Sequence, residues 1–405
     1  MTSAAMLASE PERIVTSAGE VRVCTLAQVE TDPRWADAFR SNRKDSRYYA
    51  IVERTILQGF EYLYFVIDLP DGHRAFQPFF LLPQDLLAGS GQFVQKWAAR
   101  LRRIIPNALT LRTLMVGCAA GEGHLDEGDA AQRAAVAKAL SEAARLYARK
   151  RRHRMLVFKE FLSTYRQPLA LLRTSGFTRV PSLPMTRLNI DYPDFDTYVA
   201  KALSKVTRKN IRRKLRDAEE AHGTSPITME VVRDISPFVE EALALYLQVY
   251  NRSKLHFEKL TSNFLIELGR QMPDKARFFI WRRDGRMIAM SVCLINADAI
   301  YDEYLGLDYS VALDLHLYFY TLRDIIQWAI AHGCKWYVSS ALNYDPKLHL
   351  KSNLEPLDLY VHHTWPILNF FLGRLLPLLE PTRNDPTLAK FANYKDLWGD
   401  ARGKA

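Results

Sequence analysis

The sequence lacks the features by which secreted, membrane-spanning and metal-binding proteins are recognised. Its four cysteines lie far apart, without a CxxC pair or a Cys/His spacing that builds a zinc site; they are Cys24, Cys118, Cys293 and Cys334. The first twenty residues do not combine a basic start with an apolar run, and no stretch reaches the roughly eighteen apolar residues of a spanning helix. We therefore expect a cytoplasmic protein with reduced, buried thiols and no metal.

What the sequence does contain is a large apolar fraction and an excess of positive charge. With 405 residues, of which 48% are hydrophobic, the chain is too long for one ordinary core, so two domains are expected. The formal net charge is +10, which favours partners that carry phosphate or other anions. Nucleic acid, a phosphopantetheine carrier, coenzyme A and an acidic membrane surface fit this charge equally well.

The first half of the chain predicts an alternation of strands and helices after a disordered terminus at residues 1–20. The expected strands are 62–68, 75–82, 111–116 and 155–158, and the expected helices are 33–40, 92–105 and 130–149. The turn Asp71-Gly72 joins the first two strands, and the glycine-rich loop Gly117–Gly128 precedes the long helix. Strand, loop, helix and strand in this order form a βαβ unit.

The second half repeats this order of elements. The expected helices are 235–252, 262–271 and 315–332, and the expected strands are 276–281, 287–295, 300–307 and 335–339. We expect Asp314 to cap the last helix and Gly333 to end it. The sequence thus predicts an α/β (α+β) fold of two tandem lobes, residues 21–192 and 193–365, each a mixed twisted sheet flanked by helices, followed by a helical extension at 366–405.

Between the lobes, residues 198–222 have apolar positions at helical spacing and are predicted to form one helix. Eight of the sixteen residues 201–216 are Lys or Arg and none is acidic. Because like charges at this spacing destabilise a helix that has no bound anion, we expect the basic face to hold the phosphates of a carrier. A solvated helix that pairs with acids elsewhere is the alternative. The expected binding residues are Lys205, Arg208, Lys209, Arg212, Arg213 and Arg216.

Several short motifs resemble those of one protein superfamily. Residues 198–216, YVAKALSKVTRKNIRRKLR, are similar to the segment that opens the second lobe in FemAB-like proteins. Ser175-Gly176-Phe177 before a strand, Tyr301–Gly306, and Pro346–Lys351 leading to Glu355-Pro356 resemble GNAT-type transferases of the peptidoglycan-biosynthesis-like group. The resemblance implies two fused GNAT lobes and a cleft in which a thioester or aminoacyl ester meets an amine.

The chain departs from the GNAT pattern in the loop that follows the strand 300–307. GNAT enzymes hold the pyrophosphate of coenzyme A with a glycine-containing loop there, whereas residues 307–314 contain no glycine. Binding of coenzyme A by this loop is therefore not expected. The glycine-rich loop at Gly117–Gly123 lies in the first lobe, where it is interpreted as a plain βα turn or as a backbone cradle for phosphate.

Amide formation requires a base for the acceptor amine and a group that returns a proton to the leaving atom. Asp302 and Glu303 lie within the third strand of the second lobe, where a buried carboxylate is costly, so we expect at least one of them to be catalytic. Strict alternation places Asp302 and Tyr304 on one face and Glu303 on the other. An ion pair with Arg277 or Arg286 on a neighbouring strand is the alternative.

Other candidates lie on or after the same strand. Tyr304 is on the strand, and His316 is in the first turn of the following helix, where it is placed to relay a proton. Tyrosines beyond the strand are candidates to protonate a leaving group or to contact the substrate, and two later lysines are expected to clamp an anionic substrate. These residues are Tyr309, Tyr318, Lys347 and Lys351.

The run Trp365–Leu379 is strongly apolar, but polar and helix-breaking residues interrupt it and it is too short to span a bilayer. We expect it to pack on the second lobe; contact with a membrane surface or with a partner is the alternative. The neighbouring pair His362-His363 lacks a third ligand at a suitable spacing and does not predict a metal site.

The sequence therefore predicts an acyl- or aminoacyl-transferase that joins a carrier-bound acyl group to a small amine, through an amide or ester bond, with Glu303 or Asp302 as base. The donor is a co-substrate, and no tightly bound cofactor is expected. Aminoacyl-tRNA is the preferred donor, while acyl carrier protein and coenzyme A stay open. A non-catalytic nucleic-acid-binding protein on a transferase fold is the alternative of another class, and it needs the basic helix but not the carboxylates.

Overall fold

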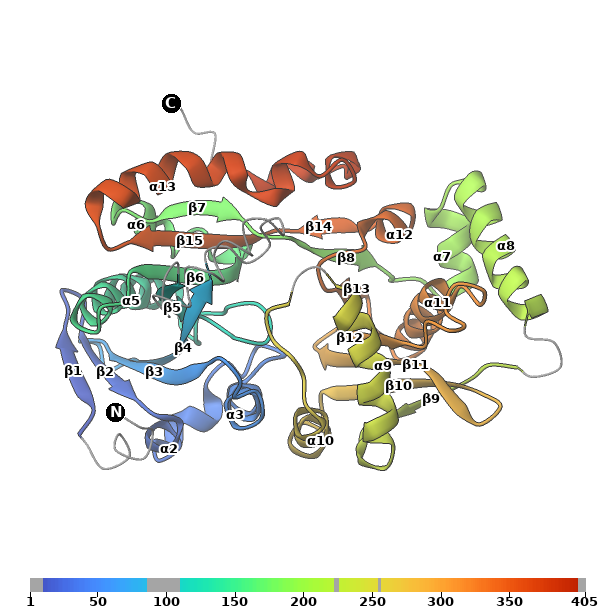
Figure 1. Cartoon of the computed structure of the whole chain (residues 1–405), viewed down its shortest axis with the longest axis horizontal. Coiled ribbons are helices and arrows are strands. Elements are labelled where there is room, and N and C mark those ends of the chain that lie inside the picture. Colours follow the sequence, from blue (N-terminus) through green and yellow to red (C-terminus); the bar gives the residue numbers. More distant parts are fainter. Residues whose placement is uncertain (1–9, 86–109, 222–225, 254–255, 400–405) are drawn as a thin grey trace, which may run out of the picture. The chain divides into compact units, whose positions relative to one another are not determined.

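The computed structural model describes residues 10–85, 110–221, 226–253 and 256–399. The chain divides into two compact units: unit 1 contains residues 1–182 and 357–383, and unit 2 contains residues 183–356 and 384–405. Each unit has one mixed sheet with helices packed against it (Figure 1). The predicted helix 92–105 lies outside the described residues.

Unit 1 is built on an eight-stranded sheet in the order β1-β2-β3-β4-β5-β6-β15-β7. Its strands pair antiparallel, except that β5 and β6 are parallel. The strands are β1 (Glu12–Val15), β2 (Glu20–Cys24), β3 (Glu61–Asp68), β4 (Arg74–Asp85), β5 (Thr110–Val116), β6 (Met155–Leu162), β7 (Thr178–Pro181) and β15 (Leu357–His363). The predicted hairpin, the strand after it and the strand that begins at Met155 are confirmed.

The long helix of unit 1, α5 (Ala130–Lys150), packs on the sheet through small side chains. It begins at Asp129, which forms a capping box with Gln132. Ala137, Leu140 and Ala144 recur at helical spacing and are fully buried, so the helix approaches the strands closely. The other helices of unit 1 are α2 (Leu26–Val29), α3 (Ser46–Thr55), α6 (Ala170–Thr174) and α13 (Pro366–Leu379).

Unit 2 is built on a seven-stranded sheet in the order β14-β8-β13-β12-β11-β10-β9, in which only β12 and β13 pair parallel. The strands are β8 (Met185–Asn189), β9 (Thr228–Val232), β10 (Ala276–Arg283), β11 (Arg286–Asn296), β12 (Ala299–Leu307), β13 (Trp336–Ser339) and β14 (Asn353–Glu355). Its helices are α7 (Phe195–Ala202), α8 (Lys205–Ala221), α9 (Val239–Arg252), α10 (Ser262–Gln271), α11 (Leu317–Ala331) and α12 (Tyr344–His349). Hairpin, strand, helix and strand recur here as predicted.

Each sheet contains one strand from the sequence range that was predicted to form the other lobe. In the chain, β8 follows β7, yet it lies between β13 and β14 in unit 2. Reciprocally, β15 follows β14 but lies between β6 and β7 in unit 1. The units therefore differ from the predicted lobes 21–192 and 193–365. Hydrophobic patterning identifies a strand but not the sheet it joins, so the exchange could not be read from the sequence.

The N-terminal prediction is wrong for part of residues 1–20, because Glu12–Val15 forms β1 and pairs with β2. The turn is closed by a hydrogen bond from Thr16 N to Gly19 O, and Glu12 pairs with Lys150 and Arg151 at the end of α5. A short hairpin of small and charged residues resembles a loose terminus in composition, which is why the pattern was missed.

The predicted single helix 198–222 is two helices, α7 and α8. Leu203 is extended, with φ −99° and ψ 148°, and the side chain of Ser204 accepts a hydrogen bond from Thr207 N at 3.2 Å. Ser204 therefore starts a new helix after one extended residue. The predicted cap of the helix 315–332 is also wrong. The capping position of α11 is occupied by His316, which is left-handed with φ 46°, and not by Asp314.

The apolar run at the C-terminus forms α13, which packs on β15 and β7 of unit 1 and not on the second lobe as predicted. The reason is the strand exchange, since β15 delivers the chain to the unit 1 sheet directly before the helix (Figure 1). No helix in the described part of the chain is long and apolar enough to cross a membrane.

A buried carboxylate anchors the exchanged strand β15. Asp358 is inaccessible to solvent, and both of its oxygens are bonded by Arg166, at 2.6 and 3.1 Å. Arg179, on the adjacent strand β7, donates to the same carboxylate at 3.1 Å. Removing one member of such a buried group leaves unpaired charge in the interior, so Asp358 holds β15 in the sheet.

We predict that Asp358→Ala lowers the free energy of unfolding by about 3 kcal/mol, because two partly buried guanidinium groups lose their counter-ion. Urea unfolding followed by circular dichroism measures this change. Glu20→Ala is the matched control, since its pair with Arg13 is exposed and its loss costs under about 1 kcal/mol. Equal effects of the two substitutions would contradict the anchoring role.

Candidate active site

The central feature of unit 2 is the point at which its one parallel strand pair separates. β12 and β13 are in register from Ala299 opposite Trp336 to Asp302 opposite Ser339. There β13 ends, while β12 continues to Leu307. Ser340 N still donates to Asp302 O at 3.2 Å, and beyond this bond the two chains diverge. Ligands of open α/β sheets bind beyond the carboxyl ends of parallel strands, which is where Asp302 lies.

A β-bulge on β12 decides which side chains face this point. Val292 of β11 is opposite Tyr304, but the next residue, Cys293, is opposite Asp302, so Glu303 has no register partner. The predicted alternation is therefore wrong in placing Asp302 and Tyr304 on one face. The extra residue puts Asp302 on the face of Cys293 and Ser291 and leaves Tyr304 on the opposite one.

The two faces of β12 are covered by different helices. A side chain at Gly306 would meet backbone atoms of Leu245 and Tyr246 at 2.8 and 2.7 Å, so α9 packs directly on this face. The ring of Tyr304 lies edge-on to Tyr246 on the same helix. On the other face Asp302 lies near Tyr318 of α11, whose pKa its charge raises. Asp302 therefore belongs to the α11 side of the sheet.

The carboxylate of Asp302 is held by two hydroxyl groups. Ser291 Oγ donates to Oδ1, and Tyr337 Oη on β13 donates to Oδ2 at 2.7 Å. Burial raises the pKa of Asp302 above its ordinary value, while these two hydrogen bonds and the charge of Lys347 act to lower it. A half-buried carboxylate with a raised pKa and a nearby cation is the arrangement expected of a proton-transfer group.

The cation near Asp302 is Lys347 on α12, which is almost fully buried. Its Nζ donates to the carbonyl oxygens of Ser340 and Leu342, at 2.5 and 2.8 Å. Burial lowers the pKa of Lys347 to about 8, although the charge of Asp302 acts in the opposite direction. Leu342 and Asn343 are left-handed, with φ 74° and 49°, so the loop that supplies these carbonyls is held in a strained conformation.

Two tyrosines complete the surroundings of Asp302. Burial raises the pKa of Tyr337, and the charge of Asp302 raises it further. The same two effects raise the pKa of Tyr318, against a lowering contribution from the Asn343 side chain. Both phenols therefore stay protonated at neutral pH, and Tyr337 donates its proton to the hydrogen bond with Asp302. Ser291 and Tyr337 were not among the predicted residues; a serine inside the apolar strand Met287–Ile295 was the signal that sequence reasoning passed over.

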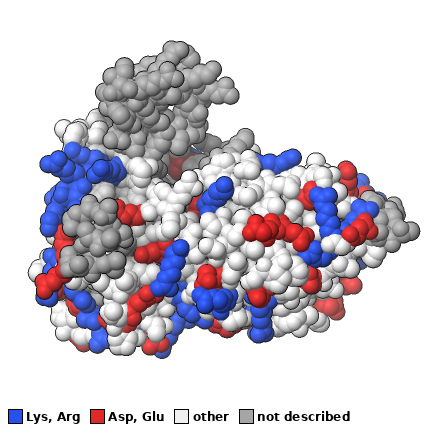
Figure 2. Space-filling view, turned by 60° about the horizontal axis from the view of Figure 1, so that its bottom comes forward, with Lys and Arg blue, Asp and Glu red and all other residues white. Residues whose placement is uncertain are grey.

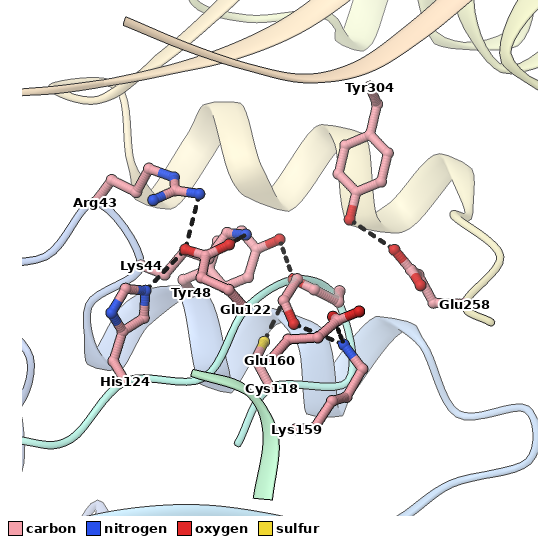
Figure 3. A network of polar contacts seen from close by, with 12 residues as sticks. Arg43, Lys44, Tyr48, Cys118, Glu122, His124, Lys159, Glu160, Glu258 and Tyr304 are labelled. Carbon is pink, nitrogen blue, oxygen red and sulfur yellow. Dashed lines mark hydrogen bonds and ion pairs between the residues drawn. The ribbon is translucent and has the colours of Figure 1, made fainter. Parts of the chain in front are cut away.

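The remaining predicted site residues are placed away from Asp302 or differently engaged. Tyr304 Oη donates to Glu258 at 3.1 Å (Figure 3). The guanidinium of Arg252 lies over the ring of Tyr309, at 3.8 Å from its centre. His316 is half-buried at the start of α11, and Lys351 is exposed. Arg286, an expected partner of the strand carboxylates, pairs instead with Asp308.

The loop after β12 has its donors engaged by a buried carboxylate. Asp308 accepts hydrogen bonds from Ser310 N and Ser310 Oγ, at 3.0 and 2.6 Å, and pairs with Arg286 at 2.6 Å. This carboxylate lies in the loop that holds pyrophosphate in GNAT enzymes. A phosphate at the two donors of Ser310 would have to displace this carboxylate.

Helix α8 presents the predicted basic residues to solvent. Lys205, Lys209, Arg212, Arg213 and Arg216 are exposed, whereas Arg208 is half-buried and bonds to Ala200 O. Within the described part of the chain, Lys205, Lys209 and Arg212 have no ion-pair partner. Figure 2 shows basic and acidic side chains interspersed over one face of the molecule, as on an ordinary solvated surface. The run on α8 departs from that pattern because no acid accompanies it up to Arg216.

Unit 1 also contains a parallel strand pair, β5 and β6. The glycine-rich loop that follows β5 lies at the place in unit 1 that corresponds to the one that Asp302 occupies in unit 2. In the predicted phosphate cradle at Gly117–Gly123, two of the three glycine amides are engaged: Gly117 N donates to Pro78 O and Gly123 N to Glu160 O. One carbonyl group of the loop binds a cation, since Lys159 Nζ donates to Gly121 O at 2.8 Å. These contacts favour the interpretation of the loop as a plain βα turn.

A buried ionic cluster lies beneath this loop (Figure 3). Glu122 bonds Arg43 at 2.7 Å, Lys44 at 2.8 Å and His124 at 2.8 Å, and all four side chains are nearly inaccessible. Burial raises the pKa of Glu122, but the two cations outweigh it and hold the pKa well below its ordinary value. A Cβ on Gly121 would lie 1.9 Å from Lys44 Nζ, so the glycine is required for Lys44 to reach Glu122.

A surface cavity of about 390 Å³ also belongs to unit 2, but it is remote from Asp302. Its lining includes Ala297, Gly333 and Cys334, which precede β12 and β13. It therefore lies at the end where the parallel strands begin, opposite to the end where they diverge. All four cysteines are buried and free, as predicted. Among the described residues, no group of three His, Cys, Asp or Glu side chains could hold a metal ion.

Comparison with known proteins places this fold. A family model described as an acetyltransferase (GNAT) domain matches residues 205–345, and no curated protein matches the sequence. The C-terminal domain of a putative lysylphosphatidylglycerol synthetase from Agrobacterium fabrum is 11% identical, with a TM-score of 0.51, over 87% of this chain and 96% of its own. FemX is 11% identical with a TM-score of 0.49, covering 82% and 94%. A tandem GNAT protein from the clavulanic acid pathway is 13% identical with a TM-score of 0.44, covering 85% and 99%.

The chain has a fold of two tandem GNAT-like units, and residues 205–345 match the acetyltransferase (GNAT) domain of acyltransferases. The matched residues 205–345 lie in unit 2, from the start of α8 to the first turn of α12; they contain Asp302, and Lys347 follows two residues after their end. The resemblance to GNAT-type transferases is thereby confirmed.

We predict that Lys347 titrates near pH 8, and that Asp302→Asn moves its pKa lower because the attraction that favours the ammonium is lost. Carbon-13 NMR of protein labelled at the lysine ε-carbon measures both midpoints. Lys347→Arg identifies the signal, and the exposed Lys335 serves as an internal reference. A Lys347 midpoint near the ordinary value of 10.5, unchanged by Asp302→Asn, would contradict this description of the site.

Proposed function

We propose that unit 2 transfers an acyl group, preferably an aminoacyl group carried by tRNA, to a small amine at Asp302. The observation that supports the carrier is the exposed row of unpaired basic residues on α8. Three such cations on one helix are typical of a site that follows a polyphosphate backbone. The observation that supports the chemistry is the half-buried Asp302 with its hydroxyl donors, at the end of the parallel strand pair.

The basic helix and the site are linked through α11. α8 packs on α11, and Lys214 Nζ lies 3.5 Å from the centre of the Phe319 ring. The preceding residue of α11, Tyr318, lies near Asp302. A carrier bound along α8 would thus reach the helix that borders the carboxylate. This connection lies within unit 2 and requires no contribution from unit 1.

Coenzyme A remains the alternative donor, and the match to a GNAT acetyltransferase model favours it. Against it stands the loop after β12, whose donors are engaged by Asp308. Acyl carrier protein, which is acidic, would also fit α8. A non-catalytic nucleic-acid-binding role would use α8 but would give no reason for a half-buried Asp302 beside a buried lysine.

In the proposed reaction the amine nitrogen bonds to the acyl carbon and the bond from that carbon to the carrier oxygen breaks. The proton that the nitrogen loses passes to the Asp302 carboxylate and is returned to the leaving oxygen. Lys347, as the ammonium ion, favours the ionised carboxylate through its charge. Tyr337 and Ser291 fix the orientation of that carboxylate, and are positioning residues.

The two pKa shifts predict a bell-shaped pH dependence for the initial rate of transfer. The rate should rise as Asp302 loses its proton, at a pH above the ordinary carboxyl value because burial raises its pKa. It should fall above about pH 8, where Lys347 loses its charge. Lys347→Arg should shift the alkaline limb to higher pH, because arginine stays protonated. An alkaline limb that does not move would contradict the role of Lys347.

The carrier proposal predicts that reversing three charges on α8, in the variant Lys205→Glu/Lys209→Glu/Arg212→Glu, weakens tRNA binding about a hundredfold at moderate salt. It should also reduce the dependence of binding on salt concentration. Filter binding of labelled tRNA over a salt series measures both. The matched control is Lys335→Glu/Lys390→Glu/Lys395→Glu, which makes the same charge change at exposed lysines elsewhere in unit 2.

Equal losses in the two triple variants would mean that only net charge matters and would contradict a site on α8. Asp302→Asn separates the enzyme from a plain binding protein. If the protein is an enzyme, this variant should retain tRNA binding and lose transfer. A plain binding protein would bind tRNA with and without the substitution and would show no transfer in the unchanged chain.

A further inference from the structure

Helix α13 of unit 1 turns an apolar face to solvent. Six of its large side chains are at least half exposed: Ile367, Phe370, Phe371, Leu375, Leu378 and Leu379. Ile367, Phe371, Leu375 and Leu378/Leu379 follow one another at three- and four-residue steps, so they form one continuous stripe. An ordinary surface helix has its polar face outside, so α13 has the opposite orientation.

The orientation is fixed by specific contacts on the inner side of the helix. Asn369 donates to Gly176 O at 2.8 Å and accepts from His363 N at 2.8 Å. Gly373 lies against Thr178 of β7, where a Cβ would be 3.2 Å from the threonine hydroxyl. In Figure 1 the helix runs along β7 and β15, the two strands it contacts. The exposed stripe is therefore held outward and is not the result of a loosely attached helix.

Positive charge borders this stripe, although Lys150 and Arg151 are paired with Glu12. Residues 361–379 contain no Asp or Glu. The helix begins beside a basic run at residues 149–154, because Arg154 lies over the ring of Trp365, at 4.7 Å from its centre. Arg149 and Arg152 in this run are exposed and have no ion-pair partner among the described residues. Arg374 adds a cation on the helix itself, over the ring of Phe370.

We propose that the outer face of α13 lies in the surface of an anionic lipid bilayer, with the basic run 149–154 against the lipid phosphates. A helix of 14 residues cannot span a bilayer, but aromatic and leucine side chains beside arginines are what an interfacial helix requires. Each basic residue near an anionic membrane surface adds to the attraction, and the stripe adds the insertion of apolar area. The proposal concerns unit 1 alone and is independent of the chemistry proposed for unit 2.

The apolar stripe of α13 could be covered by a bilayer or by a second copy of the chain, and the charge around it favours the bilayer. A copy would bring its own basic run and a net charge of +10 to a face that is already positive. An anionic bilayer neutralises the same charges. Sequence reasoning named membrane contact only as the alternative, because it placed Trp365–Leu379 against the second lobe, where its apolar side chains would have been buried.

The test is sedimentation of the full chain with vesicles of phosphatidylcholine, pure or containing about one third phosphatidylglycerol. We expect binding to the anionic vesicles, weaker binding to the neutral ones, and loss of the difference at high salt. Phe371→Glu/Leu375→Glu should reduce partitioning into anionic vesicles at least about tenfold, because it puts two charges on the inserted stripe. Both side chains are exposed, so thermal unfolding should be unchanged.

The matched control is Val15→Glu/Leu57→Glu, which makes the same charge change at two exposed apolar residues of unit 1 outside α13. It should bind anionic vesicles like the unchanged chain, within about twofold. Absence of vesicle binding, or equal losses in the two variants, would overturn the proposal. So would sedimentation-velocity evidence, without lipid, of a dimer that Phe371→Glu/Leu375→Glu dissociates.

Discussion

The carboxylate of Asp302, half-buried where β12 and β13 separate, imposes the arrangement of the rest of unit 2. An ionised group in a protein interior requires hydrogen-bond donors and a nearby opposite charge. Ser291 and Tyr337 supply the donors from the two flanking strands, and Lys347 supplies the charge from α12. Lys347 in turn needs acceptors, and the loop with Leu342 and Asn343 adopts left-handed conformations that provide them. The β-bulge, the left-handed loop and the buried Lys347 thus all serve to place and to stabilise this one carboxylate.

Unit 1 meets the same constraint in a different way at the corresponding point of its sheet. There the carboxylate is Glu122, in the loop after β5, and two cations and a histidine enclose it. The loop returns to β6 through the bridge between Gly123 and Phe161, and so closes the space that the diverging strands would leave. The two units therefore share a topology but differ at this point, with a filled interior in unit 1 and a candidate proton-transfer group in unit 2.

The sequence predicted the elements better than their partners. Strands such as β3, β4 and β11 and the helix α5 follow from periodicity, because their buried faces repeat every two or three to four residues. The exchange of β8 and β15 could not be predicted, since the pattern of a strand does not indicate which of the two sheets it joins. Within the site, Asp302 and Lys347 were predicted from their residue types. The bulge at Glu303 was not, because a one-residue insertion leaves no trace in the pattern and yet reverses the faces that follow it.

Whether Asp302 serves acyl transfer from a polyanionic carrier is tested most directly by one measurement. The full chain is incubated with tRNA charged with radiolabelled amino acids and a mixture of small amines, and the label that moves from tRNA into amide is counted. We predict transfer by the unchanged chain and a loss of about a hundredfold or more in Asp302→Asn, in protein that circular dichroism shows to be folded. Undiminished transfer in that variant, or transfer only when an acyl-coenzyme A replaces the charged tRNA, would contradict the account.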